Sequence, residues 1–96
     1  MVEIDVSVAR ADEYVVEVRE GGSSTRHTVT LDSSALERFG GGASAERLLE
    51  ESFRFLLERE PKEAILRSFE ISLIGRYFPE FESEIRRRVS GSHGER

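Results

Sequence analysis

Three consecutive arginines, Arg86, Arg87 and Arg88, form the one local basic cluster in the sequence. Adjacent guanidinium groups are suited to binding a phosphate or an acidic partner, because each can donate paired hydrogen bonds to oxygen atoms. Two of them also follow a glutamate by four residues, in the pairs Glu82/Arg86 and Glu84/Arg88, a spacing that forms ion pairs on a helix. Cations are favoured near a helix C-terminus, so we interpret the cluster mainly as a solvated helix face.

The two histidines do not indicate a catalytic or metal site. His27 lies on the inward side of an expected strand, where an imidazole with a hydrogen-bonded partner is commoner than a base or a ligand, and His93 falls in the expected tail. A metal site needs several converging donors. Ser24, His27 and Asp32 have the residue types of a catalytic triad, but nothing in their spacing suggests a nucleophile elbow. We therefore predict no catalytic residue, no cofactor and no metal, and we do not expect an enzyme.

The glycine triplet Gly40 to Gly42 precedes an expected helix, whose N-terminus attracts anions. It has neither the lysine of a P-loop nor the spaced glycines of a dinucleotide site, so we interpret it as a flexible connector. The glutamates Glu50, Glu51 and Glu58 fall on the polar face of the following helix. Exposed carboxylates keep ordinary acidities, so we do not assign acid–base catalysis to these glutamates.

The composition is that of one small acidic domain. The chain has 96 residues, a net charge of -5 and no cysteine, and this length leaves room for a single core. Without cysteine there are no disulfides, which favours a cytoplasmic protein. We expect no signal peptide and no membrane span, because the N-terminus is acidic and no apolar run approaches ~20 residues. The acidic charge weighs against nucleic acid as a partner.

Alternating apolar and polar residues predict three strands, at residues 2–8, 14–19 and 25–31. We expect them to form an antiparallel β-meander. A three-residue loop after the first strand would place Val6 opposite Tyr14. The second turn, Gly21 to Ser24, leaves two registers open: a two-residue loop puts Glu17 opposite Arg26, and a four-residue loop puts Val16 opposite Val29.

The rest of the chain is expected to be helical. Asp32 or Ser33 can cap a short helix over residues 35–39, which the glycine triplet ends. Ser44 can cap the main helix, residues 45–60. Apolar positions on this helix span an arc of about 200°, wider than the stripe of a helix that lies on a single surface. We therefore expect the main helix to be sandwiched between the sheet and the C-terminal helices.

Two prolines mark the starts of further helices, since proline suits a first helical turn. Pro61 would begin a helix that carries Ile65 and Phe69 on its apolar face, and Pro79 would begin the last helix. The segment 63–78 has the pattern of a helix-turn-helix motif. Its second helix is too short and too apolar for a DNA groove, however, and Pro79 closes it early.

We conclude that residues 1–89 form a single α+β domain, with a three-stranded antiparallel meander in residues 1–31 and a long central helix with short C-terminal helices in residues 33–89. Residues 90–96 are expected to be a disordered tail. A chain of this size has little room to bury all its rings, so some should reach the surface. The expected interaction surface consists of Tyr77, Phe78, Phe81, Arg86, Arg87 and Arg88.

The sequence favours a small cytoplasmic protein-interaction or regulatory module without catalytic activity. We expect a protein partner or self-association as a homodimer, through the aromatic C-terminal segment or an exposed sheet edge. The alternative is a nucleic-acid-binding regulator that uses residues 63–89.

Residues 55–81, FLLEREPKEAILRSFEISLIGRYFPEF, resemble a segment of short bacterial proteins of unknown function. The resemblance covers under a third of the chain. It implies no activity, cofactor or catalytic residue.

Overall fold

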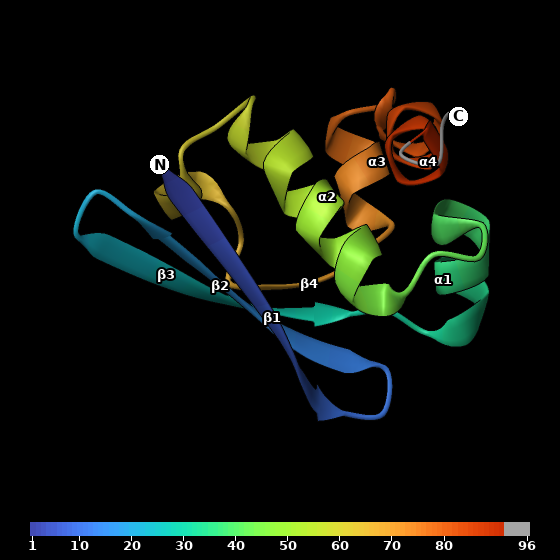
Figure 1. Cartoon of the computed structure of the whole chain (residues 1–96), viewed down its shortest axis with the longest axis horizontal. Coiled ribbons are helices and arrows are strands. Elements are labelled where there is room, and N and C mark those ends of the chain that lie inside the picture. The colour runs from blue at the N-terminus through green and yellow to red at the C-terminus, as the bar shows by residue number, and fades with distance from the viewer. Residues whose placement is uncertain (92–96) are drawn as a thin grey trace.

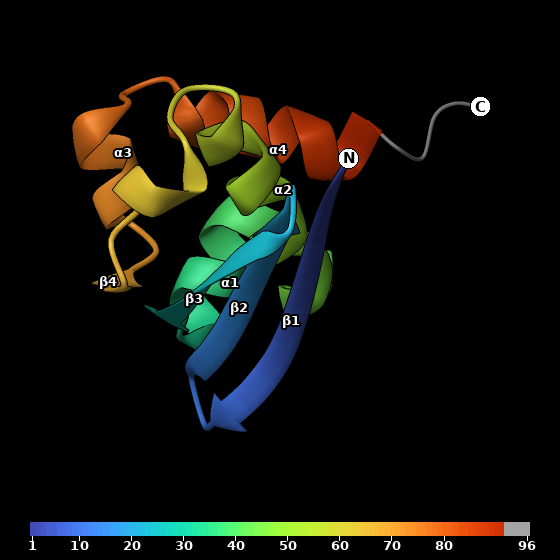
Figure 2. The same cartoon turned by 90° about the vertical axis from the view of Figure 1, so that its left-hand side faces the viewer.

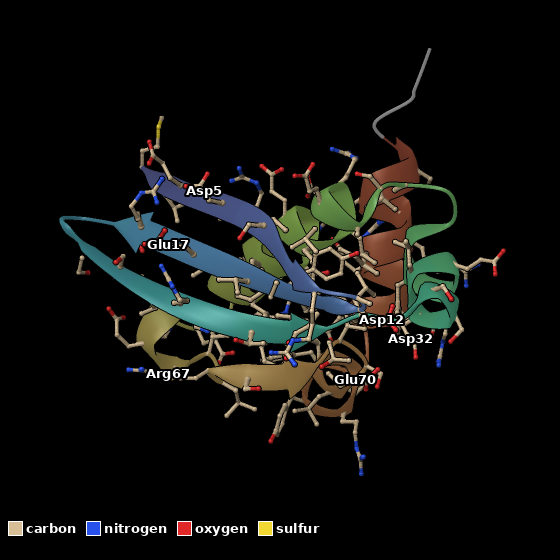
Figure 3. The ribbon with its side chains drawn as sticks, turned by 90° about the horizontal axis from the view of Figure 1, so that it is seen from below. Asp5, Asp12, Glu17, Asp32, Arg67 and Glu70 are labelled. Carbon is tan, nitrogen blue, oxygen red and sulfur yellow. The ribbon has the colours of Figure 1, made fainter. Side chains whose placement is uncertain are left out.

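The computed structural model describes residues 1–91 and contains a four-stranded mixed sheet with helices on one face (Figure 1). The class α+β is confirmed. In chain order the elements are β1 (Val2–Arg10), β2 (Glu13–Glu20), β3 (Ser23–Thr30), α1 (Ser33–Gly40), α2 (Ala45–Leu57), the 3-10 turn η1 (Lys62–Ala64), β4 (Ser68–Glu70), α3 (Leu73–Tyr77) and α4 (Phe81–Gly91). The strands lie in the order β1-β2-β3-β4. Seen from below, no helix covers β1, β2 or β3 (Figure 3).

The hairpin of β1 and β2 is antiparallel, but its register differs from the prediction. Val6 lies opposite Val16, two residues from the predicted partner Tyr14. The turn is tighter than expected, because Asp12 adopts a positive φ of 63° and the strands extend almost to it. A shift of two residues keeps every side chain on its predicted face, so the inward side of each strand was predicted correctly.

The hairpin of β2 and β3 adopts the two-residue loop, which settles the two open registers. Glu17 lies opposite Arg26. Gly21 and Gly22 have φ values of 61° and 84°. Positive φ at both central positions matches the twist of a hairpin and is tolerated best by glycine. The short loop is therefore favoured by its sequence.

A fourth strand replaces the helix that was predicted to begin at Pro61. The backbone at Pro61 is extended, η1 makes one short turn, and β4 then pairs parallel to β3 with Phe69 beside Val29. Burial explains the difference: Phe69 and Ile71 are both buried, which is the period of a strand, while Leu66 between turn and strand is 47% exposed. The described residues therefore lack the first helix of a helix-turn-helix motif.

Helix α2 is sandwiched, as predicted. The ring of Phe53 faces the sheet, with its centroid 5.2 Å from the His27 ring of β3. The ring of Phe55 faces the opposite way, 5.2 Å from the Phe81 ring of α4. Two aromatic residues two positions apart thus contact two different layers. The helix ends at Leu57, three residues before the predicted limit.

Both predicted caps form. The carboxylate of Asp32 accepts a hydrogen bond of 2.8 Å from the Ala35 N–H, and the hydroxyl of Ser44 accepts one of 3.1 Å from the Arg47 N–H. At the other end of the chain, α4 continues to Gly91 and so includes the first two residues of the predicted tail. The remaining tail, residues 92–96 with His93, lies outside the described residues. No helix within residues 1–91 is long and apolar enough to cross a bilayer.

Candidate functional site

The aromatic residues of the predicted interaction surface separate into exposed and buried groups. Tyr77 is 65% exposed, and Phe78 is partly buried beside the core. Phe81 is fully buried between Phe39 and Phe55, with ring centroids 5.5 and 5.2 Å away. Its placement on the surface was therefore wrong: as the first residue of α4 it points inward, because it continues the apolar stripe of that helix.

The arginine cluster lies on α4, and its guanidinium groups are paired with glutamates. Arg86 lies 3.5 Å from Glu82, and Arg87 forms an ion pair with Glu84. Arg88 contacts Glu84 at 3.1 Å and also reaches Glu58 of α2, 2.6 Å away. These pairs agree with the interpretation of a solvated helix face.

The ion pairs shift the acidities of the carboxylates. The hydrogen bond from Arg88 lowers the pKa of Glu58, and hydrogen bonds from Arg87 and then Arg88 lower the pKa of Glu84. The pKa of Glu82 is lowered chiefly by Arg38 of α1, which donates to it at 2.8 Å. Since each arginine already has a carboxylate partner, the cluster offers little free positive charge to a ligand.

A different surface stands out as the candidate site: an apolar groove of about 430 Å³ lined by residues of α2, η1, β4 and α3 and of the segments that join them. Figure 2 shows β4 and α3 on the same side of the molecule. Its lining consists of Leu56, Glu60, Ala64, Ile65, Leu66, Phe69, Leu73, Ile74, Tyr77 and Phe78. Ile65, Phe69 and Ile74 are buried and form the floor. Leu66 and Tyr77 are the large exposed apolar residues at the rim, and Ala64 is exposed beside them. Of the predicted surface residues, the groove contains Tyr77 and Phe78.

The groove depends on the crossover into β4. The Thr28 N–H donates to the Arg67 carbonyl at 2.7 Å, and the Ile71 N–H donates to the Thr30 carbonyl at 3.0 Å. These backbone bonds hold both ends of β4 against β3. They also fix the direction of Leu66, the residue just before this ladder, so that its side chain lies at the rim.

His27 supports the same segment from inside the fold. Its imidazole is 1% exposed, and its Nδ1 lies 2.8 Å from the Leu66 carbonyl oxygen. A carbonyl can only accept, so Nδ1 carries the proton and Nε2 accepts from the Thr25 hydroxyl, 2.8 Å away. Burial lowers the pKa of His27, against the smaller opposing effect of the Leu66 carbonyl. This histidine is a structural residue, in agreement with the interpretation from its sequence position.

Glu60 is the one charged residue in the groove lining, and it makes no ion pair with any residue among 1–91. The basic residues nearest to Glu60 in the sequence form ion pairs with other carboxylates. Lys62 is buried and lies 2.8 Å from Glu63. Arg59 donates to Glu80 at 3.1 Å. The groove thus combines apolar walls with one unpaired carboxylate.

Arg59 was not recognised from the sequence, yet it joins α2 to the segment between α3 and α4. Its guanidinium lies 3.6 Å from the centroid of the Phe55 ring and 5.9 Å from that of Phe78. It also donates to the Phe55 carbonyl at 3.0 Å. An arginine between two aromatic rings gains cation–π attraction and buries its stem. Arg59 therefore anchors Phe78, the inner wall of the groove, to the end of α2.

The acidic residues on the open face of the sheet surround an arginine. Arg19 donates to Glu3 and to Glu17, each at 3.1 Å, and also pairs with Asp5; Figure 3 shows Asp5 and Glu17 on neighbouring strands. Within residues 1–91, no group of three or more His, Asp or Glu side chains is placed to hold a metal ion.

Comparisons with protein-family models, with curated proteins and with solved structures find no match for this chain.

Proposed function

We propose that the protein is a small non-catalytic interaction module, and that the groove receives an apolar segment of a partner polypeptide carrying a basic residue. The observation that carries the proposal is the combination of apolar walls, an exposed rim of Leu66 and Tyr77, and the unpaired carboxylate of Glu60. Apolar surface rimmed by polar groups is typical of binding sites. A lysine or arginine beside Glu60 would satisfy its charge.

The dimensions support a short peptide segment. Binding pockets usually measure ~300 to 1,000 Å³, and the groove has about 430 Å³. That volume accommodates a few side chains rather than a whole helix. The walls come from a helix end, a turn, a three-residue strand and a short helix. A cytoplasmic location is part of the proposal and follows from the absence of cysteine.

Peptide display against the immobilised full chain tests the proposal. We expect the selected peptides to contain two or more large apolar residues and a lysine or arginine. Leu66→Ser should reduce their binding at least ten-fold. Val8→Ser is the matched control, because Val8 is also a large exposed apolar residue but lies on β1, outside the groove. Selection of peptides whose binding is insensitive to Leu66→Ser would contradict the proposal.

The alternative of a nucleic-acid-binding regulator stays a prediction. The pairing of Arg86, Arg87 and Arg88 with glutamates and the net charge of -5 both weigh against it. The resemblance of residues 55–81 to short bacterial proteins also stays a prediction. So does the division of the chain into a domain of residues 1–89 and a tail of residues 90–96.

A further inference from the structure

Strand β1 has an open edge. Among residues 1–91 it pairs with β2 alone, and Figure 2 shows it at the border of the sheet. Its inward residues Val2, Ile4 and Val6 are only partly buried, and Val8 is 69% exposed. A nine-residue open strand with apolar residues invites pairing with another chain.

The hairpin geometry determines which backbone groups face this edge. The pair Glu20 and Ser23 flanks the two-residue loop and is therefore hydrogen-bonded. Bonded and non-bonded pairs alternate along an antiparallel ladder. The even-numbered residues of β2 thus bond to β3 and the odd-numbered ones to β1. In β1, the odd-numbered residues bond to β2, so the N–H and C=O groups of the even-numbered residues point to the open edge.

We propose that β1 pairs antiparallel with β1 of a second copy of this chain, about a two-fold axis at Val6. Val6 then lies opposite its own equivalent, and Ile4 lies opposite Val8 of the second copy. Asp5 lies opposite Ser7, whose hydroxyl can donate to the carboxylate. The ladder runs from Ile4 to Val8 and contains about six backbone hydrogen bonds, two for each bonded pair. The two sheets join into one.

Charge selects this register over its neighbours. An axis at Ile4 would place Glu3 opposite Asp5, and an axis at Asp5 would place that residue opposite its own equivalent. Arg19 of each copy is shared among Glu3, Asp5 and Glu17, so a net negative charge remains on this part of the sheet. Like charges directly opposite each other destabilise a strand pair. An axis at Ser7 would also place no acid opposite an acid. The register irregularity between Val8 and Arg10 would, however, limit that ladder to the three residues from Val6 to Val8. The axis at Val6 gives the longest ladder in which no acid faces an acid.

Burial points to the same arrangement. Residues of β1 become more exposed toward its C-terminal end, because α2 lies over the first half of the strand and the end of the hairpin extends past the helices (Figure 1). In the proposed dimer, Ile4 of the second copy becomes the cross-strand neighbour of Val8. The most exposed apolar residue of the strand thereby gains an apolar neighbour on the inward face.

Substitution of Ser7 tests the proposal in analytical ultracentrifugation of the full chain. Each dimer contains two contacts between Ser7 and Asp5. Ser7→Lys should therefore tighten dimerisation roughly five-fold, and Ser7→Asp should weaken it by a similar factor. Ser7 is exposed, so both variants should fold as the parent does. A monomeric mass up to about 1 mM, or a dimer indifferent to both substitutions, would overturn the proposal.

Disulfide trapping identifies the axis, since the natural chain has no cysteine. Four single variants, Ile4→Cys, Asp5→Cys, Val6→Cys and Ser7→Cys, each place the thiol on one of the four axes considered. A disulfide needs Cα atoms about 4.4 to 6.8 Å apart, which a residue reaches across its own two-fold axis. We expect rapid dimer formation by Val6→Cys alone. Preferential trapping by one of the other three variants would overturn the register. Leu66→Ser changes the groove but leaves the edge of β1 intact. If the groove binds no peptide, the proposed dimer is therefore not affected, and the two proposals can be tested separately.

Discussion

The imidazole of His27 and the backbone of Leu66 are 39 residues apart in sequence and form a hydrogen bond of 2.8 Å. This bond joins the middle of the sheet to the crossover that forms the rim of the groove. The ring also packs 5.2 Å from Phe53, so the bond lies inside the core. The shape of the groove thus depends on a neutral histidine that lies beneath it.

Stability should therefore depend on the charge of His27. Burial lowers its pKa below the ordinary 6.5, so the unfolded chain binds a proton more readily than the folded one. The stabilisation is fully present above pH 6.5 and is lost as the pH falls toward the lower pKa of the folded state. We expect the free energy of unfolding in urea to decrease between about pH 7.5 and about pH 5.5.

The variant His27→Gln provides the control, because glutamine can keep both hydrogen bonds but does not titrate. It should be less stable at neutral pH and should lose most of the pH dependence in this window. The carboxylates with lowered pKa, such as Glu58 and Glu84, titrate below the ordinary 4.5 and do not interfere. An unchanged pH dependence in the variant would exclude His27 as its source.

Two glycines should respond oppositely to alanine. A Cβ added at Gly22 or at Gly75 would meet no atom within 4 Å, so space is not the difference. Gly22 has a φ of 84°, where alanine is strained, and Gly22→Ala should cost about 1 kcal/mol. Gly75 lies within α3, where Gly75→Ala should stabilise the protein by about 0.5 to 1 kcal/mol. Chemical denaturation measures both changes, and equal effects would contradict the hairpin geometry.

Arg59 should contribute more to stability than Arg38, which also lies near an aromatic ring. It contacts two rings and a carbonyl, and its side chain is only 24% exposed. Arg59→Ala should cost about 1 to 2 kcal/mol through lost cation–π attraction and packing. Arg38→Ala is the matched control: Arg38 lies 5.0 Å from the Phe39 ring but its side chain is largely exposed, so its loss should change the free energy of unfolding far less than the loss of Arg59. Similar costs in thermal unfolding would refute this role for Arg59.

The arginine cluster offers a test of the nucleic-acid alternative. Fluorescence anisotropy with labelled DNA and RNA at low salt should show no binding by the natural chain, because each arginine of the cluster has a glutamate partner. Binding that weakens with salt and disappears in the double variant Arg86→Ala/Arg87→Ala would instead support a nucleic-acid-binding regulator.

The sequence predicted the parts of the fold that local rules determine. Alternation located β1 to β3, Asp32 and Ser44 capped the helices as expected, and the wide apolar arc of α2 indicated two neighbours. The fourth strand could not be predicted in this way. It has three residues and is held by backbone bonds to a strand about 40 positions away. Moreover, Ile65 and Phe69 have the spacing of a helix face.

The candidate site was predicted only in part, for a related reason. The aromatic C-terminal segment predicted an interaction surface that includes Tyr77 and Phe78, and both residues line the groove. The groove itself forms between α2, η1, β4 and α3, and no single segment carries its pattern. The burial of Phe81 could have been predicted, because the ring continues the apolar stripe of Ile85 and Val89 on the same helix. The unpaired state of the Glu60 carboxylate, in contrast, cannot be inferred without the packing of η1.

A charge exchange at Glu60 tests the central claim most directly. Isothermal titration calorimetry would measure the binding of one selected basic peptide to the natural chain and to Glu60→Lys. We expect roughly a ten-fold loss of affinity in the variant. A peptide in which the basic residue is replaced by glutamate should bind Glu60→Lys with most of the original affinity. The same peptide should bind the natural chain more weakly than the basic peptide does. If both peptides bind both proteins equally well, Glu60 does not face a basic residue of the partner, and the proposed recognition in the groove is wrong.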